Sequence, residues 1–272
     1  MTAALRLDSA HRGWSIVRFG AIDSTNEEAR RRALAGAADR LWIVADEQTA
    51  GRGRRGRAWI SPKGNLHASA LMIDPCPPAV AAQLGFVAGV ALVRAAKDLG
   101  ATDIGLKWPN DLMSHGAKCA GILVEGVGLG SGRAACVVGI GVNCAHTPKG
   151  LGYATSCLTR VGGQAVSPGE LFERLVQRFD EALDAWRAGE AFDRIRAAWL
   201  DCAVGLGERI AIQNGAGQRE GVFDGIDAAG RLLMRTEHGL DTIEAADLWL
   251  LPRSGALPPA VLSASHRPEG RA

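Results

Sequence analysis

The chain has 272 residues, enough to bury a large core and to form one large domain with one small one. Hydrophobic residues make up 47% of the chain and charged residues 22%, but the formal net charge is only +2. That charge argues against nucleic-acid binding by bulk electrostatics, so any anion site has to be a local cluster.

Cysteine spacing and apolar runs exclude further classes of protein. The six cysteines form no C-x-x-C pair and no metal-like spacing with histidine, so reduced, mostly buried thiols are expected. The first residues have no apolar signal core, and no later segment reaches 18 uninterrupted apolar residues. A cytoplasmic protein without a membrane segment is therefore expected.

Short strands and two helices are expected along the first half of the chain. The strands are expected at residues 14–19, 41–45, 66–73, 104–108, 121–124 and 136–142. A helix is expected from Glu27 to Leu34, with a capping box formed by Ser24 with Glu27 or by Thr25 with Glu28. A long apolar helix, buried on most sides, is expected from the proline pair at 77–78 to residue 99.

In the second half of the chain, the sequence pattern changes after residue 202 from helical to strand-like. Residues 167–200 are helical by pattern, with a break near Gly189. Five short strands separated by glycine turns follow, at residues 209–212, 221–224, 232–236, 242–244 and 248–251. Strands and helices without regular βαβ alternation favour an α+β domain over residues 1–203, followed by a small barrel over residues 204–252. Residues 253–272, rich in proline, serine and glycine, are expected to be disordered.

The stretch from Gly51 to Arg57, GRGRRGR, directly follows an expected strand. Its glycines leave backbone N–H groups open to a close anion, and its arginines carry forked donors that suit phosphate. A solvated basic loop or an RGG-type RNA segment has the same composition. Because RNA segments of that kind lie in low-complexity tracts and this one lies inside a globular pattern, an anion-binding loop is favoured.

Lys107 is expected at the end of a strand that Pro109 stops. Its charge can neutralise a phosphate or a carboxylate. Asn110 and Asp111 either hold water on Mg²⁺ or close a turn, and Trp108 is expected to anchor the core.

Two further groups of residues suggest a ligand. Alternate glycines in GIGVN, residues 139–143, indicate close approach by a packed side chain or by a ligand. Ser24, Thr25 and Asn26 offer hydroxyl and amide groups that match urea-like donors and acceptors, although one of them is expected to serve as the helix N-cap.

Six motifs follow one another in order: DSTN (23–26), EQTAGRGRRGRAW (47–59), NLHAS (65–69), KWPNDL (107–112), KCAGILVE (118–125) and GIGVN (139–143). This ordered set resembles that of biotin–protein ligases, strongly over residues 14–145 and loosely over the C-terminal barrel. The resemblance implies a catalytic domain related to class II aminoacyl-tRNA synthetases and an SH3-like barrel. It also implies that biotin reacts with MgATP to give biotinyl-5′-AMP, and that a lysine of a biotin carboxyl carrier protein domain then displaces AMP.

The resemblance, taken with the chemistry above, assigns residues to each ligand. Biotin is expected to contact Ser24, Thr25, Asn26, Gln48, Arg52, Gly53, Arg54 and Lys107. ATP or the adenylate is expected to contact Gly51, Arg52, Arg54, Arg55, Arg57, Trp59, Asn110, Gly141 and Asn143, with Arg253 as a further nucleotide contact. Lys107 and Arg54 are the expected catalytic residues, and the ligands of Mg²⁺ are not identified.

The departures from the family pattern also carry expectations. Only some 13 residues precede Trp14, too few for the DNA-binding repressor domain of bifunctional members, so DNA is not an expected partner. The segment CAHTPKGLGYATSCL has no tryptophan to stack on adenine. Four close arginines repel one another, so the loop is expected to be disordered until an anion bridges it. A homodimer, a lipoate-type ligase and a non-enzymatic nucleic-acid-binding module stay open as alternatives.

Overall fold

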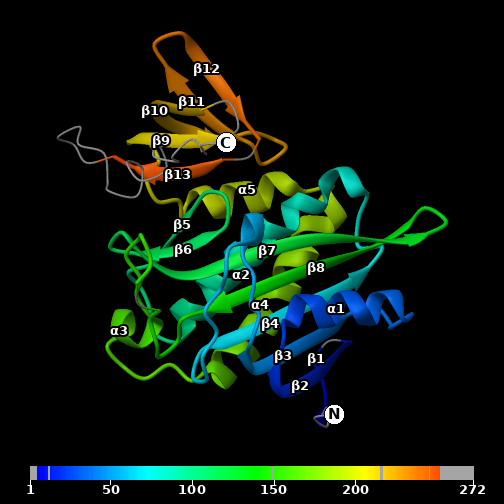
Figure 1. The fold of residues 1–272 in the computed structure, drawn as a ribbon. Helices are drawn as coiled ribbons and strands as arrows, with labels where there is room; N and C mark the ends of the chain where they lie inside the picture. Colours follow the sequence, from blue (N-terminus) through cyan, green and yellow to red (C-terminus); the bar gives the residue numbers. More distant parts are fainter. Residues whose placement is uncertain (1–4, 12, 149, 215–216, 245, 252–272) are drawn as a thin grey trace, which may run out of the picture.

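A computed structural model describes residues 5–251 of the chain, apart from residues 12, 149, 215–216 and 245 (Figure 1). The strands of its first part are β1 (Leu5–His11), β2 (Trp14–Ile22), β3 (Leu41–Gln48), β4 (Leu66–Ile73), β5 (Gly105–Lys107), β6 (Asp111–Ser114), β7 (Ala117–Gly130) and β8 (Arg133–Val142). The helices are α1 (Thr25–Leu34), η1 (Arg54–Gly56), η2 (Pro78–Gln83), α2 (Leu84–Asp98), α3 (Leu158–Gly162), α4 (Pro168–Trp186), η3 (Arg187–Gly189) and α5 (Phe192–Leu200).

The first eight strands form one mixed sheet in the order β1-β2-β3-β4-β8-β7-β6-β5. Only β2 and β3, joined through α1, run parallel; the other neighbouring pairs are antiparallel. Every strand expected in this region is present, and the mixed sheet confirms the expected fold class.

The observed sheet extends beyond the sequence-based expectation. Strands β1 and β6 were not anticipated, and Asp111, which had been assigned to a turn, begins β6. Strand β7 continues through four glycines to Gly130 because antiparallel pairing with β8 outweighs the low strand propensity of glycine. A turn at Ser114-His115-Gly116 joins β6 to β7 as a hairpin.

Helix α1 begins at the residue after Ser24, whose Oγ accepts the Glu27 backbone N–H at 3.4 Å. This confirms the Ser24–Glu27 register, but only half of the capping box forms. The Ser24 N–H donates to Asp23 Oδ1 at 2.7 Å, and the Glu27 carboxylate accepts from Arg52 at 2.8 Å instead of returning to the cap. The first turn of α1 therefore already contacts the arginine loop.

Helices cover both faces of the large sheet (Figure 1). Helix α1 packs over β3, β4 and β8 on one face, and α2 and α4 pack together on the other. The segment Pro78–Asp98 is long and apolar enough to cross a membrane, but 72% of its most apolar window is buried inside the molecule. It is therefore the core helix that its lack of a polar face predicted.

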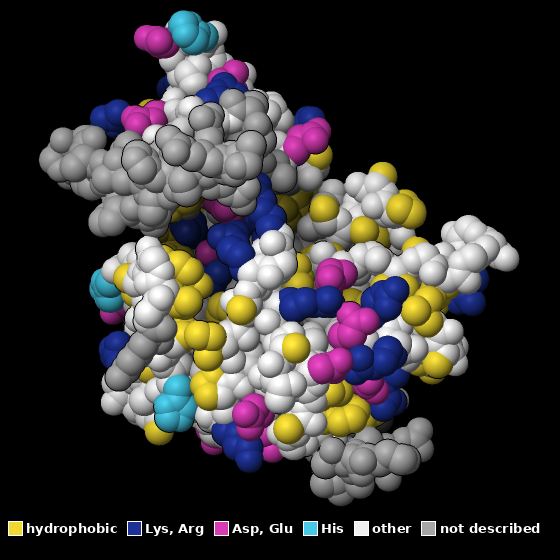
Figure 2. Space-filling model, in the orientation of Figure 1, with side chains coloured by type: hydrophobic (Ala, Val, Ile, Leu, Met, Phe, Trp, Pro, Cys, Tyr) yellow, Lys and Arg dark blue, Asp and Glu magenta, His cyan; other side chains and the backbone are white. Residues whose placement is uncertain are grey.

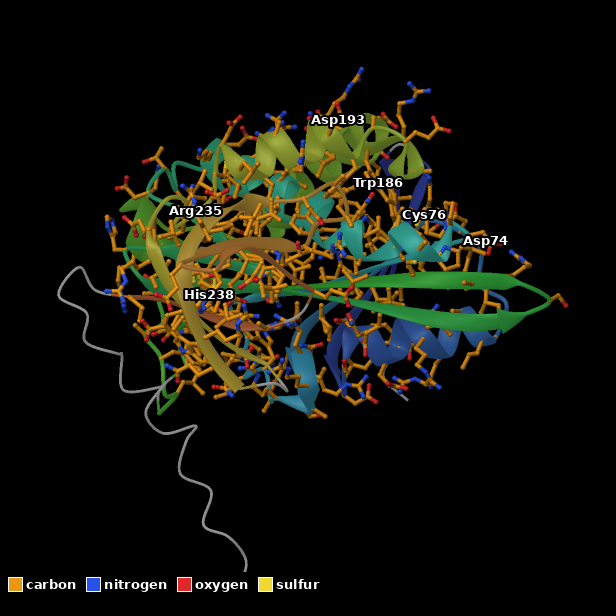
Figure 3. All side chains as sticks on the ribbon, turned by 90° about the horizontal axis from the view of Figure 1, so that it is seen from above. Asp74, Cys76, Trp186, Asp193, Arg235 and His238 are labelled. Carbon is orange, nitrogen blue, oxygen red and sulfur yellow. The ribbon has the colours of Figure 1, made fainter. Side chains whose placement is uncertain are left out.

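The C-terminal strands form a second, antiparallel sheet in the order β12-β11-β10-β9-β13. These strands are β9 (Arg209–Asn214), β10 (Gly217–Ile226), β11 (Leu232–Thr236), β12 (Gly239–Ile243) and β13 (Asp247–Leu250), as expected for an SH3-like unit. In Figure 3 this sheet, marked by Arg235 and His238, lies at the opposite end of the molecule from Asp74 and Cys76. Residues 253–272, including Arg253, lie outside the described residues.

The two sheets share one hydrophobic core. Trp108 is 2% exposed, and its Nε1 donates to the Gly230 carbonyl at 3.1 Å. Gly230 lies so close to Phe86 that an added Cβ would come within 2.7 Å of the ring. The expected core role of Trp108 is confirmed, and this indole fixes the C-terminal sheet against the part of the chain that forms the large sheet.

All six cysteines are free thiols, four of them buried. Burial raises the pKa of Cys119 and of Cys144 to about 12, and that of Cys136 to about 11. These three thiols therefore stay protonated at neutral pH, as expected for cysteines that serve packing.

Candidate active site

A cavity of about 950 Å³ lies where the large sheet meets β13. Its size is that of a pocket for a small organic ligand. One end is lined by Ser24, Thr25, Asn26, Gln48 and Gly139, with Arg52 beside it next to Glu27 and Glu125. The other is lined by Gly53, Arg54, Arg57, Lys107, Lys118 and Asp247, with Trp59, Trp108, Asn110, Gly141, Tyr153 and Trp249 around them. Figure 2 shows lysine and arginine side chains gathered in the hollow below the C-terminal part.

The first end is a network of neutral hydrogen bonds. Gln48 Oε1 accepts both the backbone N–H and the Oγ1 hydroxyl of Thr25, at 2.8 and 3.0 Å. The amide Nε2 of Gln48 donates to Ser61 Oγ at 2.8 Å. Ser69 Oγ, fully buried on β4, lies 2.8 Å from Thr25 Oγ1 and 2.6 Å from Asn26 Oδ1. Because these polar atoms are already paired, this wall is formed before any ligand arrives.

Gly139 makes room for Asn26. A Cβ built at Gly139 would lie 2.1 Å from Asn26 Oδ1, too close for any side chain. Asn26 Nδ2 meanwhile donates to Glu125 Oε2 at 2.7 Å. The first of the alternate glycines in β8 thus indicates a packed side chain that is itself part of the cavity wall.

Gly141 plays the same part for Trp59. A Cβ at Gly141 would lie 2.4 Å from Trp59 Nε1, so the indole lies flat over the strand. Within the described residues, the buried Trp59 Nε1 has no hydrogen-bond partner. Lys118 Nζ lies 5.5 Å from the centre of this indole and 5.8 Å from that of Tyr153, close enough for cation–π attraction.

The arginine loop, residues 51–57, is a tight return of the chain. The Gly53 N–H donates to the Arg57 carbonyl at 2.7 Å, and the Trp59 N–H donates to the Gly51 carbonyl at 2.9 Å. Arg54 lies inside the cavity, where it donates to Asn110 Oδ1 at 3.1 Å and to the Ala246 carbonyl at 3.3 Å. Burial lowers the pKa of Arg54 from its ordinary value, and the charge of Asp247 partly offsets that shift.

Asp111 lies between two lysines of the cavity wall. Its Oδ1 is 2.6 Å from Lys118 Nζ, and its Oδ2 is 3.7 Å from Lys107 Nζ. Burial lowers the pKa of Lys107, and the charge of Asp111 partly offsets that shift. Lys107 ends β5, as expected, and only 20% of its side chain is exposed. Two ammonium groups therefore face the cavity from β5 and β7.

Among the described residues, all but three of the predicted site residues line this cavity. The exceptions are Gly51, Arg55 and Asn143, so their expected nucleotide contacts find no support in the geometry. Gly51 packs against the Trp59 carbonyl, 2.5 Å from where its Cβ would be, and Arg55 points to Asp247.

Asn143 supports the cavity wall from behind. It is 1% exposed, and its Nδ2 donates to the Ser156 carbonyl at 3.1 Å. Asn65 Oδ1 accepts the backbone N–H groups of residues 144, 145 and 146. Together these two amides hold the segment that brings Tyr153 to the cavity, which explains the asparagine at the end of GIGVN.

The sequence-based site assignment missed the lining residues Lys118, Tyr153 and Asp247, and it missed Ser69, which hydrogen-bonds to the lining residues Thr25 and Asn26. Lys118 belongs to the motif KCAGILVE, so its place beside Lys107 could have been proposed from the hairpin that joins β6 to β7. Ser69 belongs to NLHAS and alternates inward on a strand. Tyr153 and Asp247 follow no motif, and their role depends on the tertiary arrangement alone.

No group of three or more histidine, cysteine, aspartate or glutamate side chains that could hold a metal occurs among the described residues. Asp111 is engaged by two lysines, and Asn110 Oδ1 accepts from Arg54. The residues present therefore do not fit a resident Mg²⁺ site. Magnesium coordinated mainly by substrate phosphates would need no such group.

Comparison with known proteins agrees with this geometry. Residues 19–143 match the Biotin/lipoate A/B protein ligase family. The biotin--[acetyl-CoA-carboxylase] ligase of Paracoccus denitrificans is 42% identical over 84% of this chain and 97% of its own length. The bifunctional ligase/repressor BirA of Bacillus subtilis is 30% identical over 88% of this chain and 74% of its own length.

The structural comparison gives the same result. The biotin protein ligase from Aquifex aeolicus in complex with biotin and ATP superposes with a TM-score of 0.76 and 27% identity, covering 86% of this chain and 98% of that one. The similarity thus extends over both sheets and is not limited to the six motifs. The chain belongs to the biotin/lipoate A/B protein ligase family, and within that family it is a biotin–protein ligase.

Proposed function

We propose that the protein activates biotin with ATP as biotinyl-5′-AMP and transfers the biotinyl group to a lysine of a biotin carboxyl carrier protein domain. The observation that carries this proposal is the division of one cavity into a neutral hydrogen-bonding end and a cationic end. A ligand with an amide-like head and a carboxylate, joined to a nucleotide phosphate, matches that division.

In the first step a biotin carboxylate oxygen attacks the α-phosphorus of MgATP. The new bond is an acyl oxygen–phosphorus bond, and the bond to the β-phosphate oxygen breaks, so pyrophosphate leaves. Both reactants are anions, and Arg54, Lys107 and Lys118 surround the place where they have to meet. Fixed cations in a partly buried site lower the cost of bringing these charges together. Mg²⁺ is proposed to enter and leave with the phosphates.

In the second step the carrier lysine attacks the acyl carbon as a neutral amine. A carbon–nitrogen bond forms, the carbon–oxygen bond to the phosphate breaks, AMP leaves with the bonding electrons, and the nitrogen loses one proton to water. The ammonium groups that stabilised the adenylate also stabilise the departing phosphate. No further anion has to be accommodated, so one set of cations serves both steps.

The proposed ligand contacts follow from the two ends of the cavity. Biotin is assigned to Ser24, Thr25, Asn26, Gln48 and Gly53, with Arg52 at its carboxylate side. The adenylate is assigned to Arg54, Arg57, Trp59, Lys107, Asn110, Lys118 and Gly141. Tyr153, in the segment that lacks a tryptophan, is proposed to contact the nucleotide.

The proposal also sets partners and organisation. Residues 1–203 are proposed to form the catalytic domain and residues 204–252 the C-terminal domain. The reaction takes place in the cytoplasm, and neither DNA nor a membrane is a proposed partner. The chemistry is the same whether the chain acts alone or as a homodimer.

The test uses the purified full chain with ATP, labelled biotin and a biotin carrier domain. We expect pyrophosphate release that requires biotin, followed by label on the carrier, and no label on a carrier whose acceptor lysine is changed to arginine. Lipoate is offered in parallel, and transfer of lipoate alone would overturn the biotin assignment. Salt-dependent RNA retention without pyrophosphate release would instead favour a nucleic-acid-binding module.

A further inference from the structure

Glu125 of β7 does not line the cavity, but its side chain contacts the hydrogen-bond network of the neutral end. Its Oε2 accepts from Asn26 Nδ2 at 2.7 Å, and 39% of the side chain is exposed. The oxygens of a carboxylate only accept, so Asn26 has to turn its Nδ2 toward Glu125 and its Oδ1 toward Ser69. Glu125 therefore fixes which way round the Asn26 amide lies.

A backbone carbonyl fixes the other side of the same network. Ser61 Oγ donates its hydrogen to the Trp59 carbonyl at 2.9 Å, so it has to accept from Gln48 Nε2 at 2.8 Å. The Gln48 amide thereby turns its Oε1 toward Thr25, whose backbone N–H it accepts at 2.8 Å. Acceptor oxygens therefore stand on both sides of the network, with two hydroxyl groups between them.

Three contacts connect these oxygens, but only two hydroxyl hydrogens are available. Ser69 Oγ lies 2.6 Å from Asn26 Oδ1 and 2.8 Å from Thr25 Oγ1. Thr25 Oγ1 lies 3.0 Å from Gln48 Oε1. The Ser69 hydrogen serves the shortest contact, to Asn26, and the Thr25 hydrogen can then serve Gln48 or Ser69 but not both. The network is therefore short of one donor.

A ligand N–H group can supply the missing donor. Thr25, Asn26 and Gln48 line the cavity, whereas Ser69 lies behind them and is fully buried. An N–H donated to Gln48 Oε1 replaces the Thr25 hydroxyl there, and the Thr25 hydrogen then turns to Ser69. No heavy atom has to move, and every contact then holds a hydrogen. The wall is therefore matched to a ligand head that carries N–H donors.

We propose that Glu125 is a positioning residue that makes this wall select a ligand with an N–H donor, such as the ureido head of biotin. With the Asn26 amide reversed, its Nδ2 would donate to Ser69 and the Ser69 hydrogen would pass to Thr25. The network would then be complete without a ligand, and an incoming N–H would find no free acceptor. Glu125 prevents that reversal because its oxygens cannot donate. This inference rests on the proposed function.

The central experiment measures the Kd for biotin by calorimetry, with the full chain and without ATP. Glu125→Gln keeps the shape of the side chain but can donate, so it permits both orientations of Asn26. We expect biotin to bind this variant about tenfold more weakly, the equivalent of one hydrogen bond. Glu125→Asp, which again only accepts, should bind biotin more tightly than Glu125→Gln does. Glu220→Gln is the matched control, because Glu220 is 38% exposed and pairs with Arg209 on the C-terminal sheet.

A double-mutant cycle with Ser69→Ala tests the route of the effect. The other oxygen of Glu125, Oε1, lies 3.9 Å from Arg52, so loss of its charge could act through that arginine instead. Without the Ser69 hydroxyl, the orientation of Asn26 no longer reaches Thr25. Glu125→Gln should therefore weaken biotin binding by less than about twofold in the Ser69→Ala background. An equal loss of affinity in both backgrounds would overturn the positioning role.

Kinetics of pyrophosphate release provide a further readout. Glu125→Gln should raise the KM for biotin about tenfold, while kcat and the KM for ATP change less than about threefold. General damage to the site would change all three constants, and an unchanged affinity for biotin would also overturn the inference.

The outcomes separate this inference from the proposed function. If the unaltered protein binds biotin but releases no pyrophosphate, the proposed function fails and calorimetry still decides the role of Glu125. A chain that binds no biotin overturns both. Thermal unfolding of each variant verifies folding, and Glu125→Asp tests the same contact should Glu125→Gln not fold.

Discussion

The two ends of the cavity are built by opposite means. At the biotin end, Thr25, Gln48 and Ser69 are joined by short hydrogen bonds between uncharged groups, largely out of contact with water. At the phosphate end, Arg55 and Arg57 lie largely in solvent and are held by Asp247, a carboxylate from the second sheet. The hydrogen-bonded wall is rigid because its buried polar atoms have no alternative partners. The exposed arginines, in contrast, can exchange Asp247 for another anion.

This difference matches the demands of the two ligand parts. A neutral head group leaves little charge to drive rearrangement, so its site has to be formed in advance. A triphosphate carries enough charge to displace an exposed carboxylate, and its products have to leave again. Variants at each end should therefore fail in different ways.

The largest effect is expected for Arg54→Ala. Loss of a half-buried cation that faces the reacting phosphate should reduce kcat/KM for adenylate formation about 100-fold to 1,000-fold. The free energy of unfolding should fall by only about 1 kcal/mol, since Arg54 makes two hydrogen bonds in a solvent-connected cavity. Arg30→Ala, which removes an exposed partner of Glu27, is the control. Pyrophosphate release and denaturant unfolding measure both quantities, and normal activity in Arg54→Ala would contradict the assignment.

Gly139→Ala tests the rigid wall. The added Cβ would displace Asn26, and a shift of about 1 Å at a positioning group costs about 100-fold in rate. Overpacking should also lower the free energy of unfolding by about 1–3 kcal/mol. Gly126→Ala on β7 is the matched control, because nothing lies within 4 Å of its Cβ position. If both variants turn over biotin equally well, the close approach of Asn26 is not what Gly139 serves.

A smaller effect is expected for Ser69→Ala. Loss of its hydroxyl leaves Thr25 and Asn26 in place but without their shared partner. We expect the KM for biotin to rise about tenfold, the equivalent of one hydrogen bond, with the KM for ATP unchanged. Ser114→Ala removes a buried hydroxyl that has no partner within the described residues, and it should change neither constant. A matching rise in both constants for Ser69→Ala would show that the two ends are not independent.

The smallest effect concerns pH. Burial lowers the pKa of His67, which lines the cavity, below its ordinary value of 6.5. The unfolded chain therefore binds a proton at higher pH than the folded chain does. Stability is complete above about pH 6.5 and falls as the pH drops from there toward the lower, folded pKa.

Denaturant unfolding of the ligand-free protein between pH 7.5 and about 5 tests this dependence. The unaltered protein should lose stability relative to His67→Gln over that range, because glutamine does not titrate. His238→Gln, which changes an exposed histidine, is the control and should leave the slope unchanged. If the free energy of unfolding changes with pH in the same way in His67→Gln and in the unaltered chain, His67 is not held neutral.

The local parts of this protein could be predicted from its sequence. The spacing of hydrophobic residues and the positions of turn residues predicted α1, the core helix and all five C-terminal strands. Both signals reflect the preferences of a few neighbouring residues. The pair Gly139 and Gly141 correctly indicated close approach, since absence of a Cβ is a local property. Twelve of the site residues that were predicted from the ordered motifs line one cavity.

The remaining features were decided by tertiary structure. The sequence could not show whether Gly139 faces a ligand or Asn26, because that depends on how α1 packs on β8. Asn143 supports the wall instead of lining it because Ser156 and Asn65 lie behind it. The sequence also could not show that Asp247 contacts the arginine loop, because the two are 190 residues apart. The spacing of charged residues along a chain does not show which of them form ion pairs. The partner of an arginine is decided only when distant parts of the chain pack together.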